Sequence, residues 1–484
     1  MTPPVAPPAS TPYPPAGPYG SAVAGVSARP VASPYPQPVP YGYPGPYGAW
    51  RPPAPAPRIQ HSGAGWLVVV LSVLAIVGAG ITGIASAVAV AGTGATWHTR
   101  ADALALPAAN APAATWNAWA RRAADDALGK QAKALLDGDE AGFLAAVDPR
   151  ADTLLTEMRR RFDLLHQLGP GRWEQQTDGA AKAIGSHEWR IDLRLDYCFG
   201  DATCRMNRLV IETDWRLDEG HLVMTDLETT DGRQYGPRPW ETRSRLIVAA
   251  GDRTVVAAPS RYDSRLTETV ATAERAAAVA DALGRWGGAP SRYVIFLASS
   301  DDWKTWYGTK PPDWSAGYYV RKTDNEVVVN ALATTTGLWE LLTHELTHAS
   351  TLAGPRKGYD DEREQRENWW LAEGIADYAA LIGRAVTSYD ALPLVRRYVK
   401  GDWDGNPAVA PPPDSADLAD AAARYGVACL SVRRIADVYG QDAMLAFWGK
   451  VMHEGLSLQD ASTQALGASW STVSADVTQY LRRV

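Results

Sequence analysis

Residues 338–350, LWELLTHELTHAS, place two histidines four positions apart on a segment with helical spacing. At about 100° per residue, His344 and His348 lie about 40° apart around the helix axis, whereas Leu342 and Leu346 share another arc. One helix can therefore present its imidazoles to a cleft and its leucines to a core. The stretch predicts a helix that lies between a polar site and the interior of a domain.

Glu345 follows the first histidine directly and completes the pattern His-Glu-x-x-His. Two imidazoles on one helical face are typical zinc ligands, and the adjacent carboxylate can reach a metal-bound water without binding the metal itself. In a chain of this composition, the expected number of chance occurrences of this pattern is on the order of 0.015. The alternative is a helix whose two histidines are satisfied by other hydrogen bonds.

A catalytic zinc site needs three protein ligands and an open position, so a third ligand is expected downstream of His348. The acidic residues at positions 360–367 belong to a charged, polar stretch without apolar anchoring. Glu373 lies instead in the apolar segment 369–380, WWLAEGIADYAA, on one helical face with Asp377. Two such carboxylates repel unless a cation or an imidazole N–H lies between them. We therefore predict Glu373 on the metal and Asp377 on the second nitrogen of a ligand histidine.

Together the two segments resemble the gluzincin superfamily of zinc metallopeptidases, and most closely its bacterial membrane-associated peptidase-MA-like members, which are related to thermolysin-like and aminopeptidase-N-like enzymes. The motifs that carry the resemblance are His344-Glu345-x-x-His348 and Trp370-Leu371-x-Glu373-Gly374-x-Ala376. The resemblance covers residues 243–484 and implies bound Zn²⁺, Glu373 as the third ligand and Glu345 as the general base. Asp377 matches the aspartate that orients a zinc histidine in thermolysin-like enzymes. Position 354 is glycine, so the short metzincin pattern, which needs a histidine there, is absent.

The same resemblance gives a role to Tyr425, in the segment 423–428, ARYGVA, which is similar to the catalytic tyrosine of the aminopeptidase-N-like branch. A phenol can donate a hydrogen bond to the oxyanion that develops on the substrate. A tyrosine packed at a helix interface is the alternative. The run 314–319, WSAGYY, is a candidate for the sheet edge that receives the substrate backbone. It lacks the Gly-Ala-Met-Glu-Asn-like sequence that binds a free amino terminus in aminopeptidases, which favours an endopeptidase.

These residues predict an enzyme that hydrolyses peptide or protein substrates with bound Zn²⁺. The alternative is a catalytically idle ligand-binding or scaffold module on a peptidase fold, which Glu345 disfavours because a structural zinc helix has no need of a base there. A net charge of −7 over 484 residues, without a basic patch, argues against nucleic acid as a partner. No sequence feature indicates an oligomeric state.

The N-terminal part of the chain has a different composition. Residues 1–62 are dominated by Pro, Tyr, Gly and Ala. They bury too little apolar surface to offset their ordering entropy, so we expect a disordered tether, with recognition of its Tyr-Pro units as the alternative. Residues 66–91 carry no charge and exceed the roughly 20 residues that cross a bilayer as a helix. They predict one transmembrane helix rather than a cleaved signal peptide, whose apolar region is shorter and closer to the N-terminus.

The charges around this span predict its orientation. Arg29, Arg51 and Arg58 precede it, and no acidic residue occurs before Asp102. Because the cytoplasmic flanks of membrane helices are rich in Lys and Arg, the tail is predicted to be cytoplasmic and the catalytic domain to lie outside the cell membrane. Residues 66–91 would then anchor the chain in the lipid bilayer.

Residues 112–236 predict helices near 116–128 and 154–168, followed by strands at 189–195, 209–217 and 221–227. This order resembles the cone-shaped α+β domains of the nuclear-transport-factor-2-like superfamily. The resemblance implies a cone that can bind a small ligand, with a structural module as the alternative. Cys198 and Cys204 enclose a short loop between strand-like runs and predict a hairpin disulfide, with reduced thiols as the alternative, whereas Cys429 is predicted to be buried in a helix.

From position 243 onward, the pattern predicts strands at 246–250, 255–258, 293–297 and 326–330, a helix at 265–283 and then mainly helices. The Pro-rich stretch 407–413 predicts a loop, with Asp414 or Ser415 as the N-cap of the following helix. The chain is thus predicted to be α+β, with a disordered Pro-rich tail, one transmembrane helix, a cone-shaped domain and a gluzincin-like peptidase domain.

The predicted topology is testable with compartment-sensitive reporters fused at Ala49 and at Pro239. We expect opposite compartments for the two fusions, because the uncharged span at 66–91 separates them and the arginines lie on one side only. Equal signals from both fusions, or a mature N-terminus near Thr93, would contradict an uncleaved anchor.

Overall fold

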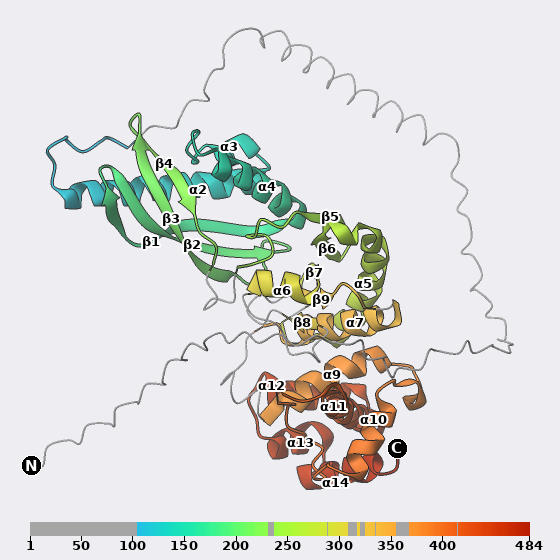
Figure 1. The fold of residues 1–484 in the computed structure, drawn as a ribbon. Helices are drawn as coiled ribbons and strands as arrows, with labels where there is room; N and C mark the ends of the chain where they lie inside the picture. The colour runs from blue at the N-terminus through green and yellow to red at the C-terminus, as the bar shows by residue number, and fades with distance from the viewer. Residues whose placement is uncertain are drawn as a thin grey trace, which may run out of the picture. The chain divides into compact units, whose positions relative to one another are not determined.

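The computed structural model describes residues 104–230, 237–287, 289–307, 317–319, 325–333, 335–354, 367–413 and 415–484. The predicted tail at 1–62 and the predicted membrane span at 66–91 lie outside these residues. Within the described ranges, no helix has both the length and the apolar composition needed to cross a bilayer. The described chain combines helices with sheets, which confirms the α+β class (Figure 1).

The N-terminal domain is an antiparallel meander of four strands packed on helices (Figure 1). Its elements are α2 (Ala113–Asp137), α3 (Glu140–Leu144), α4 (Asp152–Leu168), β1 (Pro170–Gly185), β2 (Glu188–Phe199), β3 (Asn207–Asp218) and β4 (His221–Leu227). The two predicted helices and three predicted strands are confirmed: β4 has the predicted bounds, and the other four predictions lie within longer elements. The sequence patterns missed α3 and β1, and β1 shifts register at three places along β2, which breaks the alternation that marks a strand.

Two local features determine where these elements end. Gly138 and Gly169 follow α2 and α4 in the left-handed conformation, with φ of 73° and 71°, which a glycine adopts without steric cost. Glu219 and Gly220 both have positive φ, 46° and 83°, as a tight two-residue hairpin between β3 and β4 requires.

Tryptophans fill the interior of this domain. Trp119, Trp189 and Trp215 are at most 2% exposed, and Trp173 and Trp240 pack with Tyr197 in the same core. Large aromatic side chains thus form the packed interior of this domain. Both predicted roles of the 112–236 segment, ligand binding and structural support, stay predictions.

The second sheet has the strand order β5-β6-β7-β9-β8. Its strands are β5 (Leu246–Ala250), β6 (Thr254–Pro259), β7 (Tyr293–Ala298), β8 (Gly317–Tyr319) and β9 (Glu326–Asn330). β6, β7 and β9 run parallel, and β5 and β8 pair antiparallel at the two edges. The helices α5 (Asp263–Leu283) and α6 (Ser300–Tyr307) lie in the connections between these strands. All four strands predicted for this part of the chain, and the helix at 265–283, are confirmed.

Both faces of the second sheet are buried. Val256 and Ile295 point into a core formed with α5 and with α7 (Thr335–Thr351), whereas Val255 and Phe296 point into the tryptophan-rich core of the N-terminal domain. A sheet covered on both sides shows continuous apolar strands, as these do. The two predicted domains therefore share a core.

Polar contacts accompany this shared core. The Tyr197 hydroxyl donates to Glu326 Oε1 over 3.2 Å. Burial raises the pKa of Glu326 to about 7, although the nearby Arg238 guanidinium opposes the shift. The Asn325 amide donates to the carbonyl of Phe199 over 2.7 Å. These bonds fix β9, which pairs with the edge strand β8, against the tip of the first sheet.

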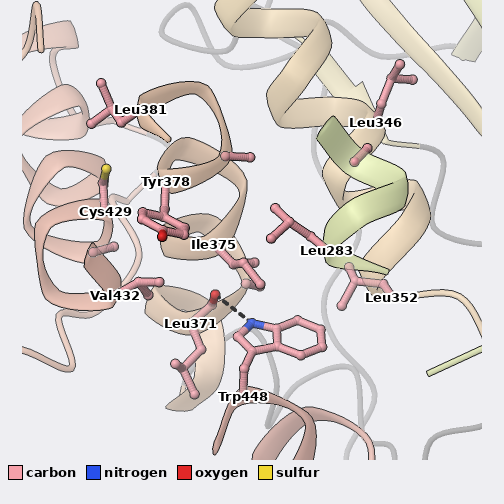
Figure 2. Packing of buried hydrophobic residues seen from close by; sticks show 14 of the residues in the cluster. Leu283, Leu346, Leu352, Leu371, Ile375, Tyr378, Leu381, Cys429, Val432 and Trp448 are labelled. Carbon is pink, nitrogen blue, oxygen red and sulfur yellow. Dashed lines mark hydrogen bonds between the residues drawn. The ribbon is translucent and has the colours of Figure 1, made fainter. Parts of the chain in front are cut away.

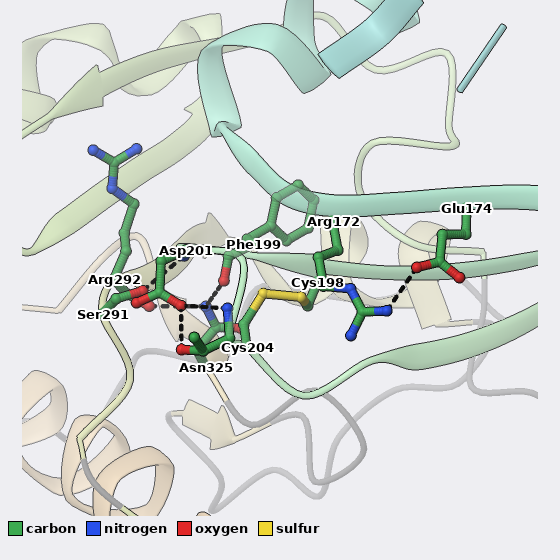
Figure 3. Close-up of a disulfide and its surroundings, with 10 residues drawn as sticks. Arg172, Glu174, Cys198, Phe199, Asp201, Cys204, Ser291, Arg292 and Asn325 are labelled. Carbon is green, nitrogen blue, oxygen red and sulfur yellow. Dashed lines mark hydrogen bonds and ion pairs between the residues drawn. A yellow bond between two sulfur atoms is a disulfide. The ribbon is translucent and has the colours of Figure 1, made fainter. Parts of the chain in front are cut away.

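The disulfide between Cys198 and Cys204 is confirmed, with its Cα atoms 6.0 Å apart (Figure 3). It closes the loop after β2, and the backbone N–H of Asp201 in this loop donates to Ser291 Oγ over 2.8 Å. The disulfide therefore shapes a loop that contacts the segment before β7. Cys429 is buried, as predicted.

The C-terminal part is helical, as predicted. It comprises α9 (Trp369–Leu381), α10 (Leu392–Lys400), α11 (Leu418–Tyr439), α12 (Gln441–Met452), α13 (Leu458–Leu466) and α14 (Trp470–Leu481). The predicted N-cap of α11 was wrong, because Asp417 fills this position and its side chain accepts from the backbone N–H of Asp420 over 2.8 Å. Ala416 forms a turn with Pro413, so the Pro-rich loop continues beyond Ser415 before the helix begins.

α9 packs very closely against α11. A Cβ atom on Gly374 would lie 2.6 Å from the carbonyl oxygen of Ala428, so only glycine permits this approach. Ile375 of α9 and Val432 of α11 belong to the same core, and the indole of Trp448 donates to the carbonyl of Leu371 over 2.9 Å (Figure 2). Because Glu373 directly precedes Gly374 on α9, these contacts determine where Glu373 lies.

The substitution Gly374→Ala tests this close contact. We expect it to lower the free energy of unfolding by about 1–3 kcal/mol, because the added methyl group forces α9 and α11 apart. Gly129→Ala is the matched control, since Gly129 lies on the exposed side of α2 and a Cβ there meets nothing within 4 Å. It should raise the free energy of unfolding by about 0.5–1 kcal/mol. Urea unfolding measures both, and equal midpoints would show that the two helices separate without cost.

Candidate metal centre

The histidine motif lies on α7, as predicted. Leu342, Leu346 and Ala349 of this helix are fully buried in the core below the second sheet. Ser350 Oγ donates to the carbonyl of Ala280 on α5 over 2.7 Å, which fixes the C-terminal end of α7. His344 lies on the other side of the helix, with its side chain 12% exposed.

Glu373 lies on α9, and its carboxylate contacts both histidines of the motif. Glu373 Oε2 lies 3.1 Å from His344 Nε2 and 3.0 Å from His348 Nε2, and the two imidazole nitrogens are 3.1 Å apart. Ligands about 2.0–2.2 Å from a tetrahedral zinc ion lie roughly 3.3 Å from one another, so this triangle is close to the size that one ion requires. The three residues form a group that can hold a metal ion.

His344, His348 and Glu373, the metal-binding trio, are held together by the attraction between the carboxylate and the imidazoles. Burial lowers the pKa of His344, but its hydrogen bonds to Asp377 and Glu373 dominate and raise that pKa well above the ordinary value. Burial raises the pKa of Glu373, but the imidazoles of His348 and His344 hold it well below its usual range. A divalent cation can take the place of this charge, because the same atoms converge on one point.

Asp377 lies beside the second ring nitrogen of His344, as predicted. Its Oδ1 is 2.7 Å from His344 Nδ1. When Nδ1 donates to a carboxylate, Nε2 keeps its lone pair for a metal. The other carboxylate oxygen, Oδ2, accepts a hydrogen bond from the hydroxyl of Tyr389 over 2.9 Å. Tyr389 was not predicted, because it lies in the connection between α9 and α10 and belongs to no motif.

Glu345 and Tyr425 also lie at the trio. Glu345 follows His344 on α7 and is 4% exposed. A Cβ on Gly317 would lie 2.4 Å from Glu345 Oε1, so the edge strand β8 passes directly beside this carboxylate. The ring of Tyr425, on α11, is centred 6.0 Å from that of His344 and makes an edge contact with Trp369. The structure thus brings together all six of the predicted site residues.

Two further predictions concern the run 314–319 and the acidic residues at 360–367. Of the run 314–319, residues 317–319 form β8 at the sheet edge, and 314–316 lie outside the described residues. Among the acidic residues at 360–367, only Glu367 is described, and it is exposed and outside the metal-binding group.

Comparisons with known proteins give weak likenesses. No protein-family model matches the chain, and no curated protein matches it. Among solved structures, it is similar to yeast LTA4 hydrolase in complex with bestatin, with a TM-score of 0.28 and 15% identity over 49% of this chain and 36% of that chain. The native yeast LTA4 hydrolase gives a TM-score of 0.32 and 10% identity over 60% and 64%. The chain spans less than two thirds of either structure, and scores this low decide neither fold nor activity.

Replacing Glu373 tests the third ligand. Glu373→Gln exchanges an anionic oxygen for a neutral amide, so we expect zinc affinity to fall at least tenfold. Glu367→Gln is the matched control, and it and Glu364→Gln should leave zinc content unchanged. Zinc analysis of the purified variants after dialysis provides the measurement. Equal zinc content in all three variants would place the third ligand elsewhere.

Proposed function

We propose that the chain is a zinc-dependent metallopeptidase of the gluzincin type, which hydrolyses peptide bonds. One observation carries the proposal, namely the convergence of His344, His348 and Glu373 to within 3.0–3.1 Å beside the buried carboxylate of Glu345. Two imidazoles and one carboxylate are a donor set typical of catalytic zinc. Three protein ligands leave a position for water and substrate, whereas a structural site uses four.

The residues around the trio support a division of roles. Zinc bound to these ligands would polarise the substrate carbonyl and lower the pKa of a coordinated water. Glu345 takes the proton of the attacking water and returns it to the nitrogen of the leaving amine. Tyr425 donates its hydroxyl hydrogen to the oxyanion on the former carbonyl carbon. Asp377 holds the imidazole of His344 in the tautomer that binds metal through Nε2.

The position of β8 supports a mode of substrate binding. β8 is an edge strand paired with β9, and Gly317 on it lies against Glu345. An extended peptide can add to a sheet edge through backbone hydrogen bonds, which would place its scissile bond beside this carboxylate. Because such binding needs no free amino terminus, we propose an endopeptidase.

The proposed location is outside the cell membrane, with residues 66–91 as a single-pass anchor and the N-terminus in the cytoplasm. The charge pattern around the span motivates this topology. The Cys198–Cys204 disulfide supports it, because disulfides form and persist in oxidising compartments.

Substituting Glu345 separates metal binding from catalysis. Glu345→Gln keeps the size of the side chain and both imidazoles, so zinc should stay bound near one ion per chain while peptide turnover falls by about 10² to 10⁴. His344→Ala should lose zinc and activity together, because two ligands do not hold a catalytic zinc site. Zinc content and cleavage of a peptide library are measured side by side.

Two outcomes would contradict this assignment. A Glu345→Gln protein that cleaves at the wild-type rate would refute the proton-transfer role and leave the metal site intact. A wild-type chain that binds zinc but cleaves no peptide would support the idle-module alternative.

A further inference from the structure

We propose that Tyr389 is a positioning residue for the metal ligand His344 and acts through Asp377. The inference rests on the proposed zinc site. Two hydrogen bonds in series carry it, because the Tyr389 hydroxyl donates to Asp377 Oδ2 over 2.9 Å and Asp377 Oδ1 lies 2.7 Å from His344 Nδ1. Both carboxylate oxygens are thereby occupied, one by each neighbour.

Asp377 needs this second partner to keep its orientation. The final torsion of an aspartate side chain is broad, so a carboxylate held at one oxygen can rotate. The Asp377 side chain is 21% exposed, which allows water to compete for its oxygens. The hydrogen bond from Tyr389 fixes the carboxylate plane, and Oδ1 then stays directed at His344. Outer partners of this kind orient metal ligands and raise their basicity.

The backbone around Tyr389 is fixed on both sides. Its N–H donates to the carbonyl of Val386, and its own carbonyl accepts from Leu392, each over 3.0 Å. Arg384, earlier in the same connection, binds Glu340 over 3.1 Å, and Glu340 lies on α7, the helix that carries His344. The loop that presents Tyr389 is therefore tied to the ligand helix itself.

α11 leaves room for the tyrosine ring. A Cβ on Gly426 would lie 3.1 Å from Tyr389 Cε1 and 2.2 Å from Val395 Cγ2, so a larger residue there would displace both side chains. Burial, with the nearby Asp377 carboxylate, raises the pKa of Tyr389 well above its ordinary value. The hydroxyl therefore keeps its proton and acts as a donor.

Tyr389→Phe tests the inference, because it removes only the hydroxyl and keeps the ring. The matched control is Tyr378→Phe, since Tyr378 donates to Gln441 Oε1 over 3.1 Å and has no hydrogen bond to Asp377 or His344. Zinc affinity of the full chain is measured by competition with a chelator, and unfolding is measured without zinc. We expect zinc affinity to fall about 10–100-fold in Tyr389→Phe and to stay unchanged in Tyr378→Phe, although both variants lose one partly buried hydrogen bond.

Coupling to Asp377 supplies the readout that a merely structural role would not change. In an Asp377→Ala background, Tyr389→Phe should cause no further loss of zinc affinity, because the path to His344 is already broken. Additive losses in the double variant, or wild-type zinc affinity in Tyr389→Phe, would overturn the inference while leaving the proposed function intact. A wild-type chain that binds zinc but cleaves no peptide would overturn the proposed function alone, and one that binds no zinc would overturn both.

Discussion

The arrangement of the candidate metal centre depends on one electrostatic constraint. A carboxylate and two imidazoles lie within about 3 Å of one another and are almost completely buried. Such a group is stable only when positive charge lies among its members, either as protons or as a metal ion. Glu373 and His348 expose no more than 10% of their side chains, so water cannot replace that charge. The helices that carry these three residues are held in place by their own cores.

Two helices from different parts of the chain meet at the triangle, and each is fixed by its own core. α7 is buried against α5 beneath the second sheet, and α9 is buried against α11, where Gly374 allows the backbones to approach. The three candidate ligands therefore lie on helices rather than on loops, as the narrow geometric limits of metal binding require. The N-terminal domain contributes indirectly, because it covers the face of the sheet opposite α7.

The chemistry that the site can perform follows from its asymmetry. One side consists of the three candidate ligands and of the two hydrogen bonds that join His344 to Asp377 and Asp377 to Tyr389. The other side presents Glu345 with the edge strand β8 beside it, where an extended backbone can bind. Function is carried by such a site rather than by the fold around it, so the assignment stands on these residues.

The sequence by itself determined the parts that depend on local periodicity and spacing. It located α7 and α9, proposed His344, His348 and Glu373 as ligands, and predicted the Cys198–Cys204 disulfide, because helical spacing and a short enclosed loop bring such residues together within one or two elements. The sequence did not predict strand β1, because register shifts break the alternation of that strand. Only the tertiary structure revealed Tyr389 beside Asp377, Gly317 beside Glu345, and a core shared by the two sheets. Those contacts join residues on separately packed elements, and their distances are decided by how whole elements pack rather than by the pattern within any one of them.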